Sequence, residues 1–113
     1  MRILAIERVI PLPARPDLRE ILREEAAEVW NLQKRGFIRD IWFTATDRHA
    51  IVMLECTGID EARQLLATLP LVRSGLIEFI LHELHSYDGF ERLFATGTDP
   101  VPPAPKTEEP PEY

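Results

Sequence analysis

The chain has few of the features that most often mark a function from sequence: cysteines, long apolar runs and an excess of basic residues. Cys56 is the only cysteine in 113 residues, so an intramolecular disulfide is impossible and an oxidising, secreted setting is not indicated. No apolar run approaches the roughly 20 residues of a membrane-spanning helix, and the short N-terminal segment with Glu7 does not resemble a signal peptide. We therefore expect a cytoplasmic protein that has no membrane partner.

The negative net charge and the scattered glycines exclude further functional classes of protein. The net charge is −6 with a pI near 5.0, whereas nucleic-acid binding needs a basic stripe to contact phosphates. The five glycines form no phosphate-binding loop or dinucleotide fingerprint. His82 and His85 share a face of a helix but lie on opposite faces of a strand, and this segment is predicted to be a strand. No nucleic acid, cofactor or metal is therefore expected.

The length and the C-terminal composition predict one domain followed by a tail. A chain of 113 residues is long enough for one domain and too short for two. Residues 96–113 contain six of the ten prolines and four acids against Lys106, so they cannot bury enough apolar surface to offset their ordering entropy. We expect a folded domain over residues 1–95 and a disordered or extended tail over 96–113.

Hydrophobic periodicity predicts four strands and two helices. Branched aliphatic or alternating runs indicate strands at 3–10, 37–45, 49–56 and 76–85. Helical stripes indicate a helix at 17–36, which begins at Asp17 and ends at Gly36. A second helix is indicated at 59–69, ended by Pro70, and residues 88–95 suggest a last helical turn. This β-α-β-β-α-β order predicts an α+β, ferredoxin-like split β-α-β fold with a four-stranded antiparallel sheet and both helices on one face.

The sheet face without helices is predicted to be too apolar to face water. One side of the third strand carries Ile51 and Met53, and the second strand contributes a large aromatic residue, Trp42. A monomer would expose these side chains, and the same face of a second copy would cover them. The sequence therefore predicts a homodimer, or a larger homo-oligomer, built as a dimeric α+β barrel.

Several polar residues lie among apolar strand neighbours and are candidates for a small-molecule site. An apolar enclosure with a few titratable groups is typical of a ligand pocket, and burial brings carboxylates and imidazoles into the range for proton transfer. The alternative is that each is a strand-end side chain in water or part of an interface ion pair, and Trp42 is either a pocket wall or core packing. The strand candidates are His49, Glu55, Glu78, His82 and His85, with Arg39 and Asp40 nearby in sequence.

Four short pieces of the chain resemble muconolactone isomerases. They are Leu-Gln-Lys-Arg-Gly at 32–36, Arg-Asp-Ile-Trp at 39–42, Leu-Pro-Leu at 69–71, and Ile-Glu at 77–78 followed by His85. The spacing between the pieces is similar without large gaps, and the resemblance covers residues 18–87. After Trp42 the isomerases continue with a basic residue and an Ala-Gly-His-like hairpin, whereas this chain has Phe-Thr-Ala-Thr-Asp-Arg at 43–48.

The resemblance implies a sheet-paired dimer, assembled further into rings, and a cofactor-independent isomerase of a small unsaturated lactone or enolisable acid. Such a reaction needs a base, a donor for the enolate oxygen and exclusion of water. The implied catalytic residues are Glu25 or Glu55 as base and His49 as shuttle or donor. Arg39 would bind the substrate carboxylate, with Trp42, Glu78 and His85 as further substrate contacts. The alternatives are a cofactor-free monooxygenase or cyclase on the same fold, and a non-catalytic ligand-binding or assembly module.

Overall fold

The computed structural model describes residues 1–11 and 15–94, so the predicted tail at 96–113 and its boundary at residue 95 lie outside the described residues. The elements follow the predicted order, with one short helix in addition. They are β1 (Arg2–Val9), α1 (Leu18–Lys34), β2 (Ile38–Phe43), β3 (Ala50–Glu55), α2 (Ile59–Leu66), α3 (Pro70–Arg73), β4 (Ile77–Leu84) and the 3₁₀ helix η1 (Gly89–Leu93).

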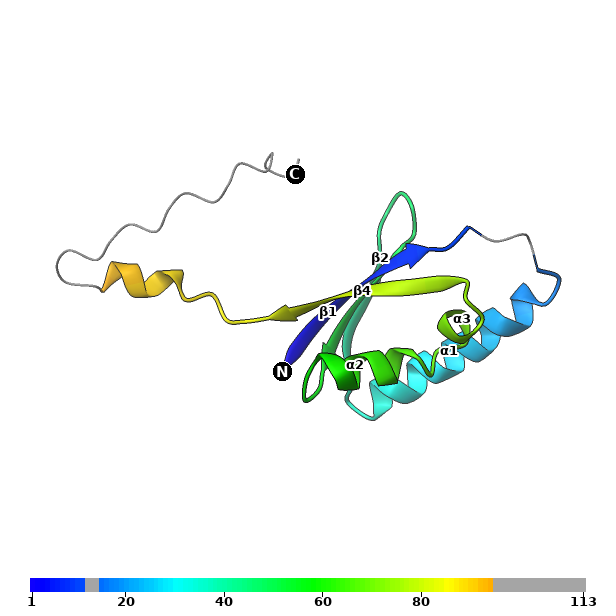
Figure 1. Ribbon diagram of the computed structural model, residues 1–113, viewed down its shortest axis with the longest axis horizontal. Coiled ribbons are helices and arrows are strands. Elements are labelled where there is room, and N and C mark those ends of the chain that lie inside the picture. Colours follow the sequence, from blue (N-terminus) through cyan, green and yellow to red (C-terminus); the bar gives the residue numbers. More distant parts are fainter. Residues whose placement is uncertain (12–14, 95–113) are drawn as a thin grey trace.

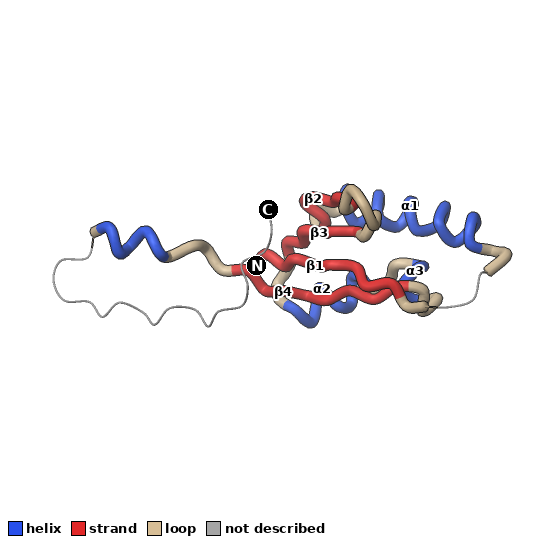
Figure 2. The backbone as a smooth tube through the Cα atoms, turned by 90° about the horizontal axis from the view of Figure 1, so that it is seen from above, coloured by secondary structure: helices blue, strands red, loops and turns tan. Residues whose placement is uncertain are grey.

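The four strands form one antiparallel sheet in the order β2-β3-β1-β4 (Figure 2). The three α-helices lie together on one side of this sheet (Figure 1). The predicted α+β, split β-α-β fold is therefore confirmed. The order places β2 and β4 at the two edges, and these two strands run in opposite directions, because each of the three neighbouring pairs is antiparallel.

The first helix begins and ends close to the predicted residues. Asp17 is its N-cap residue, but its carboxylate accepts hydrogen bonds from the Arg15 guanidinium at 3.1 and 3.0 Å rather than from the helix amides. At the other end Gly36 adopts φ +84°, a left-handed conformation that L-residues other than glycine rarely adopt, and its amide bonds the carbonyl of Gln33. Gly36 thus ends α1, and β2 begins two residues later at Ile38.

Pro70 does not end the second helix, as the sequence predicted, but begins another. Helix α2 already ends at Leu66, and α3 starts with Pro70 at its first position. Proline fits there because the first helical amides have no partner within the helix and its φ is already helical. The short α3 then packs against α1.

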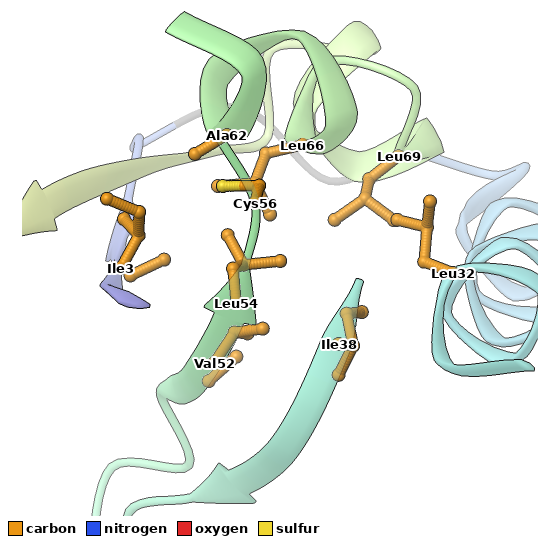
Figure 3. Close-up of a cluster of buried hydrophobic side chains, with 11 residues drawn as sticks. Ile3, Leu32, Ile38, Val52, Leu54, Cys56, Ala62, Leu66 and Leu69 are labelled. Atoms are coloured by element: carbon orange, nitrogen blue, oxygen red, sulfur yellow. The ribbon is translucent and has the colours of Figure 1, made fainter. Parts of the chain in front are cut away.

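The hydrophobic core lies between the sheet and the helices. Its most deeply buried large side chains come from β1, α1, β2, β3 and the segment after α2 (Figure 3): Ile3, Leu32, Ile38, Val52, Leu54 and Leu69. Each contributes about 1.5–3 kcal/mol by leaving water. Cys56 is buried in the same cluster, as a small apolar side chain.

A bulge in β2 interrupts the simple alternation of side chains along that strand. Ile38 pairs with Leu54, but the next pair is Asp40 with Met53, so Arg39 is the extra residue. Simple alternation placed Ile38 and Trp42 on one side of the strand. The bulge instead places Ile38, Ile41 and Phe43 on the helix-covered face and leaves Trp42 on the other.

The other side of the sheet, called the open face here, is apolar at its centre. Its central side chains come from all four strands, and Trp42 is 67% exposed there. Ion pairs flank this centre: Arg2 with Glu55 and Arg8 with Glu78. The apolar residues of the open face are Leu4, Ile6, Trp42, Ile51, Met53, Ile80 and Leu84.

Candidate functional site

A cavity of about 530 Å³ lies between α1 and the helix-covered face of the sheet. One face of α1 lines this cavity over much of the length of the helix, through Leu22, Ala26, Val29 and Gln33. A volume of this size is typical of a pocket for a small organic molecule. Most of the wall is aliphatic or aromatic, and includes Trp30, Ile41, Phe43, Leu69, Leu71 and Phe79.

Two carboxylates interrupt the apolar wall. Glu25 comes from the middle of α1, and its Oε1 accepts a hydrogen bond of 2.9 Å from the Leu71 amide. Glu7 comes from β1, and its Oε1 accepts one of 3.3 Å from the Ala50 amide. No hydrogen bond to Oε2 of Glu25 is found among the described residues, so that oxygen is available to a ligand.

Burial raises the pKa of the Glu25 carboxyl above its ordinary value of 4.5. The Leu71 amide opposes this change by stabilising the charged form, while the negative charges of Glu7 and Glu28 add to it. A carboxyl in such surroundings is a stronger base than one in water. Of the described side chains that line the cavity, Glu25 is therefore the best placed to accept a proton.

The raised pKa of Glu25 predicts how stability depends on pH. The folded protein holds this proton more tightly than the unfolded chain, so the free energy of unfolding falls as pH rises above 4.5 and reaches a plateau above the folded pKa. Glu25→Gln keeps an acceptor for Leu71 and has no charge to bury. We expect its stability relative to the wild type to increase from pH 4.5 toward neutrality, as measured by urea unfolding at several pH values.

The matched control for this experiment is Glu24→Gln, an exposed position on the same helix. Its stability should stay parallel to that of the wild type over the whole pH range. If the stability of Glu25→Gln also stays parallel to that of the wild type over the pH range, burial does not raise the pKa of Glu25.

Arg48 supplies a positive charge to the cavity wall from the β2–β3 hairpin. This hairpin is closed by the Thr44 amide bonded to the His49 carbonyl and by the His49 amide bonded to Thr44 Oγ1, both at 2.9 Å. Arg48 adopts φ +54°, which costs a non-glycine residue about 1–2 kcal/mol. In this position its guanidinium lies 4.7 Å from the centre of the Phe43 ring, beside the cavity.

The structure brings only one of the seven predicted site residues, Glu25, into this cavity. Glu55, Glu78 and Trp42 lie on the open face of the sheet instead. There Glu55 contacts the N-terminal ammonium group at 3.3 Å, and Glu78 pairs with Arg8. Two of the three are thus held in ion pairs, and their predicted roles in a substrate site stay predictions.

The remaining three predicted residues are dispersed. Arg39 is exposed in the β2 bulge, His49 is half-buried in the hairpin, and His85 is exposed beyond the end of β4. Glu7 and Arg48 also line the cavity; Glu7 was not predicted from the sequence, and Arg48 was considered only as a replacement for the polar groups of the isomerase hairpin. Glu7 could have been recognised in the sequence, because it is an acidic residue in the middle of an aliphatic strand. Arg48 reaches the cavity through the geometry of the hairpin, which the neighbouring residues in the sequence do not specify.

Within residues 1–11 and 15–94, no group of three or more histidine, cysteine or acidic side chains is arranged to hold a metal ion. No helix in the same part of the chain is long and apolar enough to cross a membrane.

The chain matches no protein-family model and no curated protein sequence. Solved structures, in contrast, are similar to it. One is a 5-chloro-2-hydroxyhydroquinone dehydrochlorinase from Burkholderia phenoliruptrix in complex with 2,5-dihydroxybenzoquinone. It is 18% identical with a TM-score of 0.56, over 79% of this chain and 98% of that one.

The second is the crystal structure of muconolactone isomerase, which is 16% identical with a TM-score of 0.68. The match covers 88% of this chain and 98% of the isomerase chain, so the two are alike over nearly the whole enzyme. At this identity the likeness concerns the fold. The protein therefore has the fold of muconolactone isomerase, as the sequence resemblance predicted.

Proposed function

We propose that the cavity binds a small unsaturated lactone or enolisable organic acid and moves a proton between two of its carbon atoms without a cofactor. The observation that carries this proposal is Glu25, a carboxyl of raised pKa in the wall of a mostly apolar cavity, with one oxygen that accepts no hydrogen bond from the described residues. The names of the two similar structures support the substrate class, because both refer to small, oxygenated, unsaturated compounds.

The proposed reaction needs one base and one site for negative charge. Oε2 of Glu25 takes the proton from the carbon next to the substrate carbonyl, so a C–H bond breaks, an O–H bond forms and the electron pair moves into an enolate. The same carboxyl then returns the proton to a different carbon of the conjugated system. Arg48 is the cation of the cavity wall that can bind the enolate oxygen or a substrate carboxylate.

One feature of the site favours a second function, non-catalytic ligand binding. Each of the two carboxylates holds a backbone amide, Glu25 that of Leu71 and Glu7 that of Ala50, and this structural role alone would account for both. In that case the cavity would bind the same kind of molecule without transferring a proton.

The use of the cavity is tested by filling it from an exposed position. Ala26 is exposed on α1 and lines the cavity, so Ala26→Trp places an indole in the space. Because a surface substitution of this kind changes stability by only about 0.5 kcal/mol, the fold is expected to persist. We expect binding of a carboxylated five-membered unsaturated lactone, measured by calorimetry, to weaken at least about tenfold, equivalent to 1.4 kcal/mol.

Ala27→Trp is the matched control, because Ala27 is also exposed on α1 but does not line the cavity. It should bind the lactone like the wild type. Proton transfer is followed separately, as incorporation of solvent deuterium into the lactone by NMR. Binding without deuterium incorporation would support the non-catalytic alternative, and binding unchanged by Ala26→Trp would place the ligand elsewhere.

We further propose that the chain forms a homodimer through the open face. Its central side chains, Ile51 and Met53 on β3 with Trp42 on β2, form a continuous apolar surface in a single chain. A contiguous apolar patch of this kind on a monomer commonly marks an interface. Pairing with the same face of a second copy would bury it and close the two sheets into a barrel.

A further inference from the structure

A carboxylate that the proposed proton transfer leaves unused lies in the cavity wall opposite Glu25. Glu7 lies on β1 on the same side as the buried Ile3 and Ala5, so its side chain points toward the helices and lines the cavity. Glu25 lines the same space from α1, which lies across the cavity from the sheet (Figure 1). A ligand between the helix and the sheet therefore has one carboxylate on each side.

The sheet fixes the orientation of the Glu7 carboxylate. The last pair of the β1–β3 ladder is Ile6 with Ile51, and the Ala50 amide at the start of β3 donates a hydrogen bond of 3.3 Å to Oε1 of Glu7. This bond ties one carboxylate oxygen to the end of the ladder. The other oxygen, Oε2, accepts no hydrogen bond from residues 1–11 and 15–94, so Glu7 presents an oriented acceptor to the cavity.

No positive charge balances Glu7 in the part of the chain that the structure describes. The ion pairs found there use other acids. Arg48, the basic residue of the cavity wall, lies over the Phe43 ring instead, and the charge of Glu7 adds to the raised pKa of Glu25. The described residues include no buried side-chain oxygen without a partner, so Oε2 of Glu7 is open to water.

Ligand binding removes this water, and the chemistry of the ligand decides what that costs. The cavity wall is mostly apolar, so a ligand that fills the cavity displaces the water at Oε2 of Glu7. A charged acceptor left without a donor is strongly unfavourable, whereas a hydrogen bond to a charged acceptor is among the stronger ones. For this reason, enzyme sites that bond a substrate hydroxyl reject the analogue without it by about 10⁴–10⁵-fold. Glu7 therefore discriminates between ligands by what they can donate.

We propose that Glu7 is a specificity-determining residue whose Oε2 accepts a hydrogen bond from an alcohol group of the ligand. The proposal rests on the proposed function for the unsaturated lactone ring and adds a hydroxyl group to it. The hydroxyl is an alcohol that keeps its proton, because Glu7 would repel an ionised oxygen. The three charged groups of the wall then have separate roles: Glu25 takes the proton from carbon, Arg48 binds negative charge and Glu7 selects the hydroxyl.

Two lactones that differ in one hydrogen-bond donor test this role. The first is a five-membered unsaturated lactone with a hydroxymethyl group, and the second is its methyl ether, which can accept a hydrogen bond but cannot donate one. We expect the wild type to bind the alcohol at least about tenfold more tightly than the ether at neutral pH, as measured by calorimetry. Glu7→Gln keeps an acceptor for the Ala50 amide and replaces the second acceptor by a donor. In this variant the ratio of the two affinities should fall to about one.

Glu83→Gln is the matched control, because Glu83 is an exposed acid on the neighbouring strand β4 and does not line the cavity. It should bind the two lactones in the wild-type ratio, and the extra methyl group of the ether affects all three proteins alike. The inference is wrong if the wild type binds the ether as tightly as the alcohol, or does not bind the alcohol. It is also wrong if Glu7→Gln, shown to be folded by circular dichroism, keeps the wild-type ratio, since Glu7 would then only hold the Ala50 amide. Selectivity that depends on Glu7 without deuterium incorporation would support this role and count against the proposed proton transfer.

Discussion

Replacing Glu25 with glutamine is expected to lower the rate of proton transfer by about 10²–10⁴-fold, the usual contribution of a general base. Glutamine has nearly the same shape and can still accept the Leu71 hydrogen bond, so the cavity should keep its form. Lactone affinity should change little, because the substitution removes the proton acceptor and leaves the apolar wall intact. The measurement is deuterium incorporation into the lactone by NMR, together with calorimetric binding.

The pH profile separates a base from a residue that only supports the fold. If Glu25 must be ionised to react, kcat/KM of the wild type rises with pH and levels off above the raised pKa of this carboxyl, which lies above 4.5. Residual activity of Glu25→Gln should lack this ascending limb. A variant with full activity, or with an unchanged ascending limb, would remove Glu25 from the reaction.

Glu24→Gln is the matched control on the same helix. Glu24 is exposed and outside the cavity, so its substitution should leave both the rate and the profile at the wild-type values. Glu7→Gln is a further informative variant, since Glu7 adds to the raised pKa of Glu25. Removing its charge should move the ascending limb toward lower pH.

The fold could be predicted from the sequence because its determinants are local. Strand and helix periods, the glycine stop at Gly36 and the order of elements are each readable within a short window. The bulge at Arg39 could not be predicted, because it depends on how β2 pairs with β3 rather than on the composition of β2. This single extra residue decides which aromatic side chain borders the cavity and which lies on the open face.

The site was harder to predict because its members are assembled by tertiary structure. Glu25 could be selected by its chemistry, yet its environment comes from Leu71 and Glu7, which are distant in sequence. In the sequence, polar strand residues such as Glu55 and Glu78 cannot be told from catalytic residues, because both are titratable residues among apolar neighbours. The pairing register places them with Arg2 and Arg8 on the open face instead.

The open face provides the second prediction of large effect. Ile51 lies on β3, with Trp42 opposite it on β2 and Ile6 opposite it on β1, so it is near the centre of the apolar surface. In the proposed dimer Ile51→Lys would bury two unpaired ammonium groups, one from each chain, at a cost of several kcal/mol each. We expect the dimer dissociation constant to increase by at least about 10³-fold, since each 1.4 kcal/mol is a factor of ten.

Sedimentation velocity over a range of concentrations measures this effect directly, because a chain of 13.0 kDa and its dimer are well separated in mass. Ile51 is only half-buried in the single chain, so the variant is expected to keep its far-ultraviolet circular dichroism. Gln64→Lys adds the same charge at an exposed position on α2, away from the open face, and should leave the dimer intact. A dimer that survives Ile51→Lys would have to use a surface other than the open face.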